Sequence, residues 1–201
     1  LSGLRKVTDE GVLFRSHLDG EEHLFTPESV VDIQLALGSD IMMALDECLE
    51  YPAARETARQ SVRRTVRWAQ AAWAHFWSPP GGQRRDGPNG ASLFPIVQGS
   101  MFADLRRQCA EQLAGLAADG YAIGGLSVGE PRELTREIVE STLEHLPAGK
   151  PRYLMGVGTP EDLVEGVDRG IDMFDCVMPT RNGRHGMAFT RHGAINLANA
   201  R

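Results

Sequence analysis

The 201-residue chain is poor in cysteine, and the cysteines it has lie far apart. Cys48, Cys109 and Cys176 contain no Cys-x2-Cys pair, so the sequence indicates neither a disulfide framework nor a zinc site. Such sparse cysteine is typical of a reducing cytoplasm, where we expect this protein. The chain also lacks an apolar run of about 18 residues and a hydrophobic N-terminal signal segment, so we expect no contact with a membrane.

Lysine and net positive charge are scarce as well. Lys6 and Lys150 are the only lysines, and neither lies at the end of a predicted strand as Asp175 does. This argues against a barrel lyase that forms a Schiff base with its substrate. The formal net charge is -6, so any RNA contact must be a local basic patch rather than the whole surface. The remaining composition, 42% hydrophobic and 24% charged, is ordinary for one globular domain with a real core.

Short apolar segments alternate with helical patterns along the chain. A β-hairpin is predicted at 11–26, and Thr26 and Pro27 start a first helix that ends at Gly38. Strands are predicted at 41–45, 93–97, 121–123, 152–155 and 171–178, helices at 54–77, 102–118, 131–145 and 160–169, a mobile loop at 78–91, and a closing hairpin at 187–197. This alternation predicts parallel strands with right-handed crossovers. Five such units do not close an eight-stranded barrel, so an incomplete barrel and an open doubly wound sheet both fit the pattern.

An acidic residue lies in the last of these predicted strands. Asp175 lies within the apolar run 171–178, where a carboxylate is costly unless it is paired or used. A Gly-rich loop that carries Arg181 and Arg184 is predicted to follow and to bind phosphate. A strand-end acid beside such a loop is typical of barrel enzymes, whereas a buried structural acid bonded to the backbone or to Arg181 is the alternative. Asp172, the nearby acid, is assigned a structural role.

Polar or flexible residues also end the other four strands. Asp46 could accept two hydrogen bonds from a flat edge such as that of guanine, and Gln98 could add a directional amide contact. Gly124 and Gly125 allow the backbone to approach a ligand, and Met155 could pack on a ring face. The structural alternatives are a helix cap, a tight turn and core filling. Together these residues predict a pocket for a planar, nitrogen-rich ring.

Five linked motifs resemble the bacterial tRNA-guanine transglycosylases (queuine tRNA-ribosyltransferases). The motifs are Asp46–Pro52, Val97–Ser100, Gly124–Glu130, Tyr153–Gly158 and Gly170–Arg184. The similarity extends over essentially the whole chain. It implies an α/β fold of the (β/α)8 TIM-barrel type, here incomplete, with central βα units after an N-terminal β-hairpin. Residues 1–201 would then form a single domain, the central part of the barrel, without the N-terminal strands and the C-terminal zinc subdomain.

The resemblance also implies a reaction and a set of site residues. The family is a glycosyltransferase (pentosyltransferase) family that exchanges the wobble guanine of tRNA for 7-aminomethyl-7-deazaguanine in queuosine biosynthesis. Asp175 matches the nucleophile that forms the covalent intermediate with ribose. Asp46, Gln98, Gly125 and Met155 match base contacts, the carbonyl of Leu126 would receive the aminomethyl group, Val128 and Cys48 would line the pocket, and Arg181 and Arg184 would lie near the anticodon loop.

Partners and cofactors follow from the same resemblance. The expected partners are the tRNA anticodon loop, the 7-deazaguanine base and a second copy in a homodimer. We expect no cofactor in this chain, because the family's zinc site would lie beyond residue 201, and its general acid would lie upstream of the hairpin. The alternative function is a non-catalytic base- or tRNA-binding paralogue, or an inactive fragment. The presence of both Asp175 and Asp46 argues against the paralogue, because a binding module needs no nucleophile.

Overall fold

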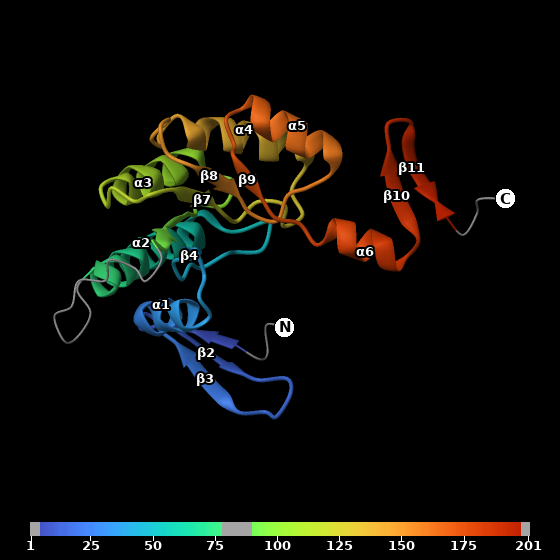
Figure 1. The fold of residues 1–201 in the computed structure, drawn as a ribbon. Coiled ribbons are helices and arrows are strands. Elements are labelled where there is room, and N and C mark those ends of the chain that lie inside the picture. Colours follow the sequence, from blue (N-terminus) through green and yellow to red (C-terminus); the bar gives the residue numbers. More distant parts are fainter. Residues whose placement is uncertain (1–4, 78–89, 198–201) are drawn as a thin grey trace.

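The computed structural model describes residues 5–77 and 90–197, which fold as parallel strands covered by helices (Figure 1). The strands are β1 (Arg5–Val7), β2 (Val12–Arg15), β3 (Glu22–Phe25), β4 (Ile41–Met43), β5 (Ser92–Phe94), β6 (Ile96–Val97), β7 (Tyr121–Ile123), β8 (Arg152–Leu154), β9 (Met173–Phe174), β10 (Met187–Thr190) and β11 (Gly193–Asn196). The helices are α1 (Pro27–Ala36), α2 (Arg55–Trp77), α3 (Ala103–Ala114), α4 (Arg132–Leu143), α5 (Pro160–Asp168) and α6 (Met178–Arg184). None of the helices in these ranges is both long and apolar enough to cross a membrane.

An antiparallel sheet of order β1-β2-β3 precedes the first helix and confirms the predicted hairpin. Helix α1 starts as the sequence predicts, with Thr26 as its N-cap. The Thr26 hydroxyl accepts from the Ser29 N–H at 3.2 Å, and the Ser29 hydroxyl accepts from the Thr26 N–H at 2.8 Å. This reciprocal capping box satisfies two backbone donors that would otherwise lack a partner. It fixes the direction in which the chain leaves the small sheet.

The predicted parallel strands are confirmed, but they form two sheets. β4 pairs with β5, and β6 to β9 form a four-stranded sheet in chain order. The single strand predicted at 93–97 is therefore wrong, because Pro95 divides it. The carbonyl of Phe94 accepts from the Ala44 N–H at 3.0 Å, whereas the carbonyl of Pro95 accepts from the Ala122 N–H at 2.9 Å. Proline has no N–H to continue the first ladder, so the chain changes its partner strand at this residue.

The segment after β8 also differs from its prediction. The strand expected at 171–178 contains only Met173 and Phe174, and the loop expected after it is helix α6. Pro179 in the first turn of α6 explains this difference, since proline is pre-organised for that position. Figure 1 shows α6 leading away from the parallel strands to the β10–β11 hairpin, which confirms the predicted closing hairpin. The predicted mobile loop lies mostly within 78–89, outside the described residues.

The core lies between the parallel strands and helices α2, α3 and α4. It includes the fully buried residues Val62, Ala69, Ala72, Leu93, Val97, Leu113 and Ile123. Burying one such aliphatic side chain stabilises the fold by about 1.5–3 kcal/mol. Buried Trp68 of α2 adds a link to the N-terminal sheet, because its Nε1 donates to the carbonyl of Asp9 at 2.9 Å.

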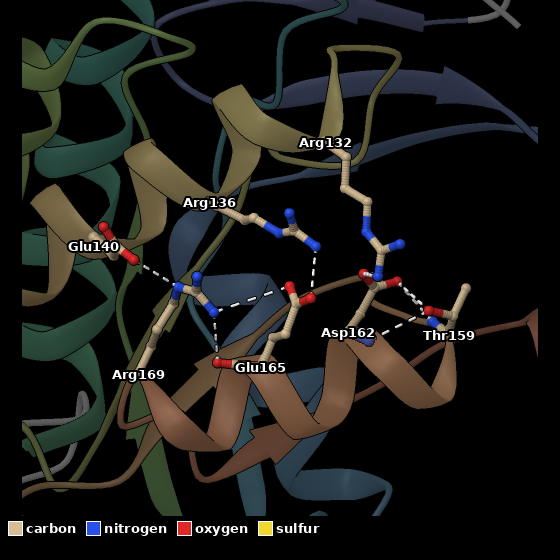
Figure 2. A network of polar contacts seen from close by, with 7 residues as sticks. All are labelled: Arg132, Arg136, Glu140, Thr159, Asp162, Glu165 and Arg169. Atoms are coloured by element: carbon tan, nitrogen blue, oxygen red, sulfur yellow. Dashed lines mark hydrogen bonds and ion pairs between the residues drawn. The ribbon is translucent and has the colours of Figure 1, made fainter. Parts of the chain in front are cut away.

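Charged side chains join α4 to α5 on the outside of the sheet (Figure 2). Arg136 pairs with Glu165 at 2.6 Å, and Arg169 pairs with Glu140 at 2.8 Å. Arg169 also donates to the backbone carbonyl of Glu165 at 2.9 Å. A third pair joins Arg132 to Asp162, whose carboxylate also caps α5 through Thr159. These contacts hold the two helices together and thereby position the loops that follow β7 and β8.

Candidate functional site

The predicted site residues follow the carboxyl ends of parallel strands. Asp46 comes after β4, Gln98 after β6, Gly125 after β7, Met155 after β8 and Asp175 after β9. Within one parallel sheet these ends lie along the same edge. Asp46 belongs to the other sheet, and a hydrogen bond joins it to this edge.

That bond connects Gln98 and Asp46. Nε2 of Gln98 donates to Oδ2 of Asp46 at 2.6 Å, and Gln98 is only 2% exposed. Burial raises the pKa of Asp46, and the hydrogen bond from Gln98 partly opposes that shift. The pair thus offers a desolvated carboxyl group whose orientation a buried amide holds, which suits recognition of N–H donors on a flat ligand edge.

Two glycines close one side of this pair. A Cβ on Gly124 would lie 2.7 Å from Nε2 of Gln98, and a Cβ on Gly125 would lie 2.2 Å from its Oε1. Gly125 also has φ +65°, a conformation that other residues adopt only with strain. The Gln98 amide therefore packs directly on the backbone, and no side chain can replace either hydrogen. The structure brings Asp46, Gln98 and Gly125 together as predicted.

Helix α2 holds the loop that follows Asp46. Buried Thr65 accepts from the Glu47 N–H at 3.1 Å, and buried Ser61 donates to the Glu47 carbonyl at 2.7 Å. The next residue, Cys48, faces the same region: desolvation and the Asp46 charge raise the pKa of its thiol. Asp46 and Cys48 both line a cavity of about 460 Å³ next to the N-terminal sheet.

The β7–α4 loop carries two further predicted residues. Leu126 is 4% exposed and its side chain belongs to the core, while Val128 is half-buried. Glu130 holds this loop, because its carboxylate accepts from the N–H groups of Ser127 at 2.6 Å and Val128 at 2.9 Å. A hydroxyl hydrogen bond from Thr135 at 2.9 Å adds to them. The loop therefore has one defined backbone conformation above the sheet edge.

Asp175 is exposed, so the prediction that it lies inside a buried strand is wrong. It lies just past the two-residue strand β9, and its Oδ1 accepts from the Gly156 N–H at 2.9 Å. Tyr153 also bonds to it: burial and then the Asp175 carboxylate raise the pKa of that phenol. Asp175 is thus oriented by the β8 strand and its loop rather than by Arg181. An exposed, hydrogen-bonded carboxylate can attack an electrophilic carbon.

The remaining predicted residues lie before β9, after β8 and on α6. Asp172 has the structural role predicted for it, since it accepts from the Arg152 N–H at 2.8 Å. Met155 is partly buried, and its N–H donates to the Ile123 carbonyl at 3.1 Å. Arg181 and Arg184 are exposed on α6 instead of on the predicted loop. Both exposed cations therefore lie within one short helix.

Sequence reasoning missed two residues of the site. Tyr153 was included only in a motif, although it contacts Asp175. Arg106 of α3 is 0% exposed and donates to the backbone carbonyls of both Gly124, at 3.0 Å, and Gly125, at 3.2 Å. The sequence contains a signal for its burial, because Arg106 lies at helical spacing from Cys109 and Leu113 and so on the apolar face of α3.

The cysteines do not form a metal site. Among residues 5–77 and 90–197, the candidate metal-binding cluster is Asp19, Glu21 and His23 on the first hairpin, and it contains no cysteine. Cys109 is fully buried in the core and its sulfur accepts from the Gln98 N–H at 3.4 Å. In the described part of the chain the three cysteines therefore do not combine into a thiolate metal site.

Parallel strands alternate with helices and carry acids, an amide and a glycine pair after their carboxyl ends, which defines an α/β protein. A family model described as queuine tRNA-ribosyltransferase matches residues 1–201, and the chain belongs to that family. A queuine tRNA-ribosyltransferase of Solibacter usitatus (strain Ellin6076) is 59% identical over 201 residues, which are 100% of this chain and 52% of that protein. One of Caldanaerobacter subterraneus subsp. tengcongensis is 52% identical over 200 residues, 100% of this chain and 51% of that protein. The chain thus spans about half the length of the curated relatives it matches.

Proposed function

We propose that this protein is a tRNA-guanine transglycosylase, a pentosyltransferase that replaces the wobble guanine of tRNA with 7-aminomethyl-7-deazaguanine. One observation carries the proposal: Asp175 is exposed and oriented at the edge to which buried Gln98 also joins the half-buried Asp46. A nucleophile and a base-reading carboxyl on the same strand-end edge suit a reaction at the bond between a sugar and a base. The names of the matched relatives support the same assignment.

In the proposed mechanism, a carboxylate oxygen of Asp175 attacks C1′ of the wobble ribose. The C1′–N9 bond breaks, its electron pair goes to guanine, and a covalent ester links Asp175 to the RNA. The incoming base then loses its N9 proton and attacks C1′, which releases the carboxylate. One proton is taken up by the leaving base and one is given up by the entering base, so the exchange is balanced. Two inversions give net retention, as in a retaining glycosidase.

The base would be recognised at the Asp46–Gln98 pair. Its N1–H and 2-amino groups would donate to Asp46, and the flat ring would lie against the Gly124–Gly125 backbone, where no side chain intervenes. Met155 would pack on the ring face, and the Leu126 carbonyl would accept from the aminomethyl group. Cys48 and Val128 would line the rest of the pocket. A base that reaches such a pocket must first leave its stack in the anticodon loop.

The RNA and the overall architecture complete the proposal. Arg181 and Arg184 on α6 would contact phosphates of the anticodon loop, so tRNA binding should weaken as salt rises.

The sheets β4–β5 and β6–β9 would form one wall of a (β/α)8 barrel, since each parallel strand run leads into a helix. A homodimer, expected from the resemblance, can be tested by light scattering. A tRNA substrate suits a cytoplasmic location.

The test is incorporation of labelled guanine into unmodified tRNA, together with gel detection of a covalent adduct, in the protein at its full natural length. Asp175→Asn should abolish both readings, because an amide is a poor nucleophile, while base binding persists. Asp172→Asn is the matched control: it removes an equally exposed carboxylate three residues away but retains an acceptor for the Arg152 N–H. A full adduct from Asp175→Asn would refute the assignment. Tight base binding by a wild-type protein that exchanges nothing would favour the non-catalytic paralogue.

A further inference from the structure

We propose that Arg106 is a positioning residue that aims two backbone N–H groups at the 6-oxo oxygen of the bound purine and so determines selectivity for that oxygen. This inference rests on the proposed function of the same site. The groups are those of Gly125 and Leu126, in the turn that closes the Asp46–Gln98 pair.

The Arg106 side chain binds two strand-end loops at once. Nε donates to the Ser100 carbonyl at 2.7 Å. Nη2 donates to two carbonyls, those of Gly124 at 3.0 Å and Gly125 at 3.2 Å. Gly99 permits this arrangement, since a Cβ there would lie 2.7 Å from Cγ of Arg106. The guanidinium is therefore a fixed bridge between the loops after β6 and β7.

The geometry of the peptide bond determines where the N–H groups next to these carbonyls point. In a trans peptide the C=O and the following N–H point in opposite directions. Because the carbonyls of Gly124 and Gly125 point toward Arg106, the N–H groups of Gly125 and Leu126 point away from it. A hydrogen bond from the Gly125 N–H slightly opposes the raised pKa of the Cys48 thiol, which places this donor on the side of the loop that faces Cys48 and Asp46. A positive group on a carbonyl polarises the attached N–H and strengthens its hydrogen bonds.

The charge of Arg106 suggests a role beyond packing. The side chain is fully buried, and no carboxylate lies within ion-pair distance of it among the described residues. Burial lowers its pKa only to about 10, so it remains a cation at neutral pH. Its Nη1 has no hydrogen-bond partner in the described part of the chain. Burying an arginine in this way is costly, and a neutral side chain would fill the same space more cheaply. The attraction between the Arg106 charge and the peptide carbonyls offsets the cost of burial and accounts for an arginine at this position.

The ligand atom follows from the chemistry of guanine. If Asp46 accepts from N1–H and the 2-amino group, the atom next to N1 on the same edge is the 6-oxo oxygen. That oxygen is an acceptor, and the N–H groups aimed by Arg106 are the donors beside Asp46. 6-Thioguanine keeps the edge that Asp46 reads but replaces the oxygen by sulfur, a weaker acceptor. It is therefore the probe that separates the contribution of Arg106 from that of Asp46.

The experiment compares guanine and 6-thioguanine in the full-length protein, both by calorimetric binding and as exchange substrates. Arg106→Met keeps the length of the side chain and removes its charge and donors. We expect guanine affinity to fall about 10- to 100-fold, 6-thioguanine affinity to fall much less, and kcat to change less than KM. Arg107→Met is the control, since Arg107 is exposed on the same helix and should behave as wild type. If Arg106→Met does not fold, Arg106→Lys takes its place, because it keeps the charge but has a single nitrogen that cannot occupy both the Nε and the Nη2 positions of the bridge.

The outcomes are distinguishable. A folded Arg106 variant that keeps the wild-type preference for guanine over 6-thioguanine overturns the inference and leaves the transglycosylase proposal intact. A wild-type protein that binds both bases but exchanges neither refutes the proposed function, while its binding ratio against the variant still tests Arg106. A wild-type protein that binds neither base refutes both.

Discussion

Gln98 and Asp46 meet across the boundary between two sheets, with Nε2 of Gln98 2.6 Å from Oδ2 of Asp46. Gln98 follows β6 of the four-stranded sheet, and Asp46 follows β4 of the two-stranded sheet. Neither sheet alone contains both side chains. The bond therefore joins the carboxyl ends of two ladders that are also linked through Pro95.

Replacing Asp46 by Asn should separate base recognition from stability. Asn keeps an acceptor for Gln98 but offers an N–H₂ group to the donors of guanine, so base affinity should fall about 10- to 100-fold. Burial raises the folded-state pKa of Asp46 above its ordinary value of 3.8, so its contribution to stability is full at low pH and is lost as pH rises through the folded pKa. The variant should thus gain in unfolding free energy relative to wild type between pH 4 and pH 7, as urea denaturation at both pH values can measure. An equal difference at both pH values would contradict the assigned desolvation.

Gly125→Ala should disrupt the site more than a matched glycine change. The new Cβ would lie 2.2 Å from Oε1 of Gln98, and φ +65° adds about 1–2 kcal/mol of strain. Gly129→Ala is the control, because Gly129 also has positive φ, +118°, but a Cβ added there would have no atom within 4 Å of it. Calorimetric binding of guanine should be lost in the first variant and retained in the second. Equal losses would mean that backbone strain, not the approach to Gln98, requires the glycine.

Glu130→Gln should loosen the β7–α4 loop at neutral pH. Burial tends to raise the pKa of Glu130, but hydrogen bonds from Ser127, Val128 and Thr135 outweigh it, so the folded-state pKa lies below the ordinary 4.5. The stability it contributes is present above pH 4.5 and is lost as pH falls through the depressed folded pKa. Hydrogen exchange at the Ser127 and Val128 amides should therefore be faster in the variant at pH 7 and converge with wild type in acid. Glu137→Gln, an exposed change on α4, should leave these amides unchanged.

Arg169→Met should lower stability without affecting the base pocket. It removes the ion pairs to Glu140 and Glu165 and the bond to the Glu165 carbonyl seen in Figure 2, and Arg169 is half-buried. We expect a loss of about 0.5–2 kcal/mol in unfolding free energy, because two partly shielded ion pairs and one hydrogen bond disappear. Guanine affinity should be unchanged in a calorimetric titration at a temperature where the variant is folded. A large change in affinity would show that α5 positions the site more directly than its contacts indicate.

Local signals account for much of what the sequence predicted correctly. Thr26 and Thr159 each precede a proline, and both cap helices, because capping depends on neighbours within three residues. The strand-end residues were predictable since parallel strands place their carboxyl ends together whatever the sheet's outline. Asp46, Gln98 and Gly125 were grouped correctly for this reason.

Predictions failed where the outcome depends on distant partners. Pro95 divides a strand because Ala44 and Ala122 bond on either side of it, and neither is near in sequence. Pro179 starts a helix although the apolar run before it resembles a continuous strand. The role of Arg106 could not be predicted because its partners are backbone carbonyls, which every residue type has.

The change of partner strand at Pro95 has a mechanical consequence. The ladder hydrogen bonds of one sheet do not continue into the other at Pro95, and the Gln98–Asp46 bond joins the two sheets close to this point. A purine bound as proposed would contact residues of both sheets. Binding should therefore reduce movement of one sheet relative to the other.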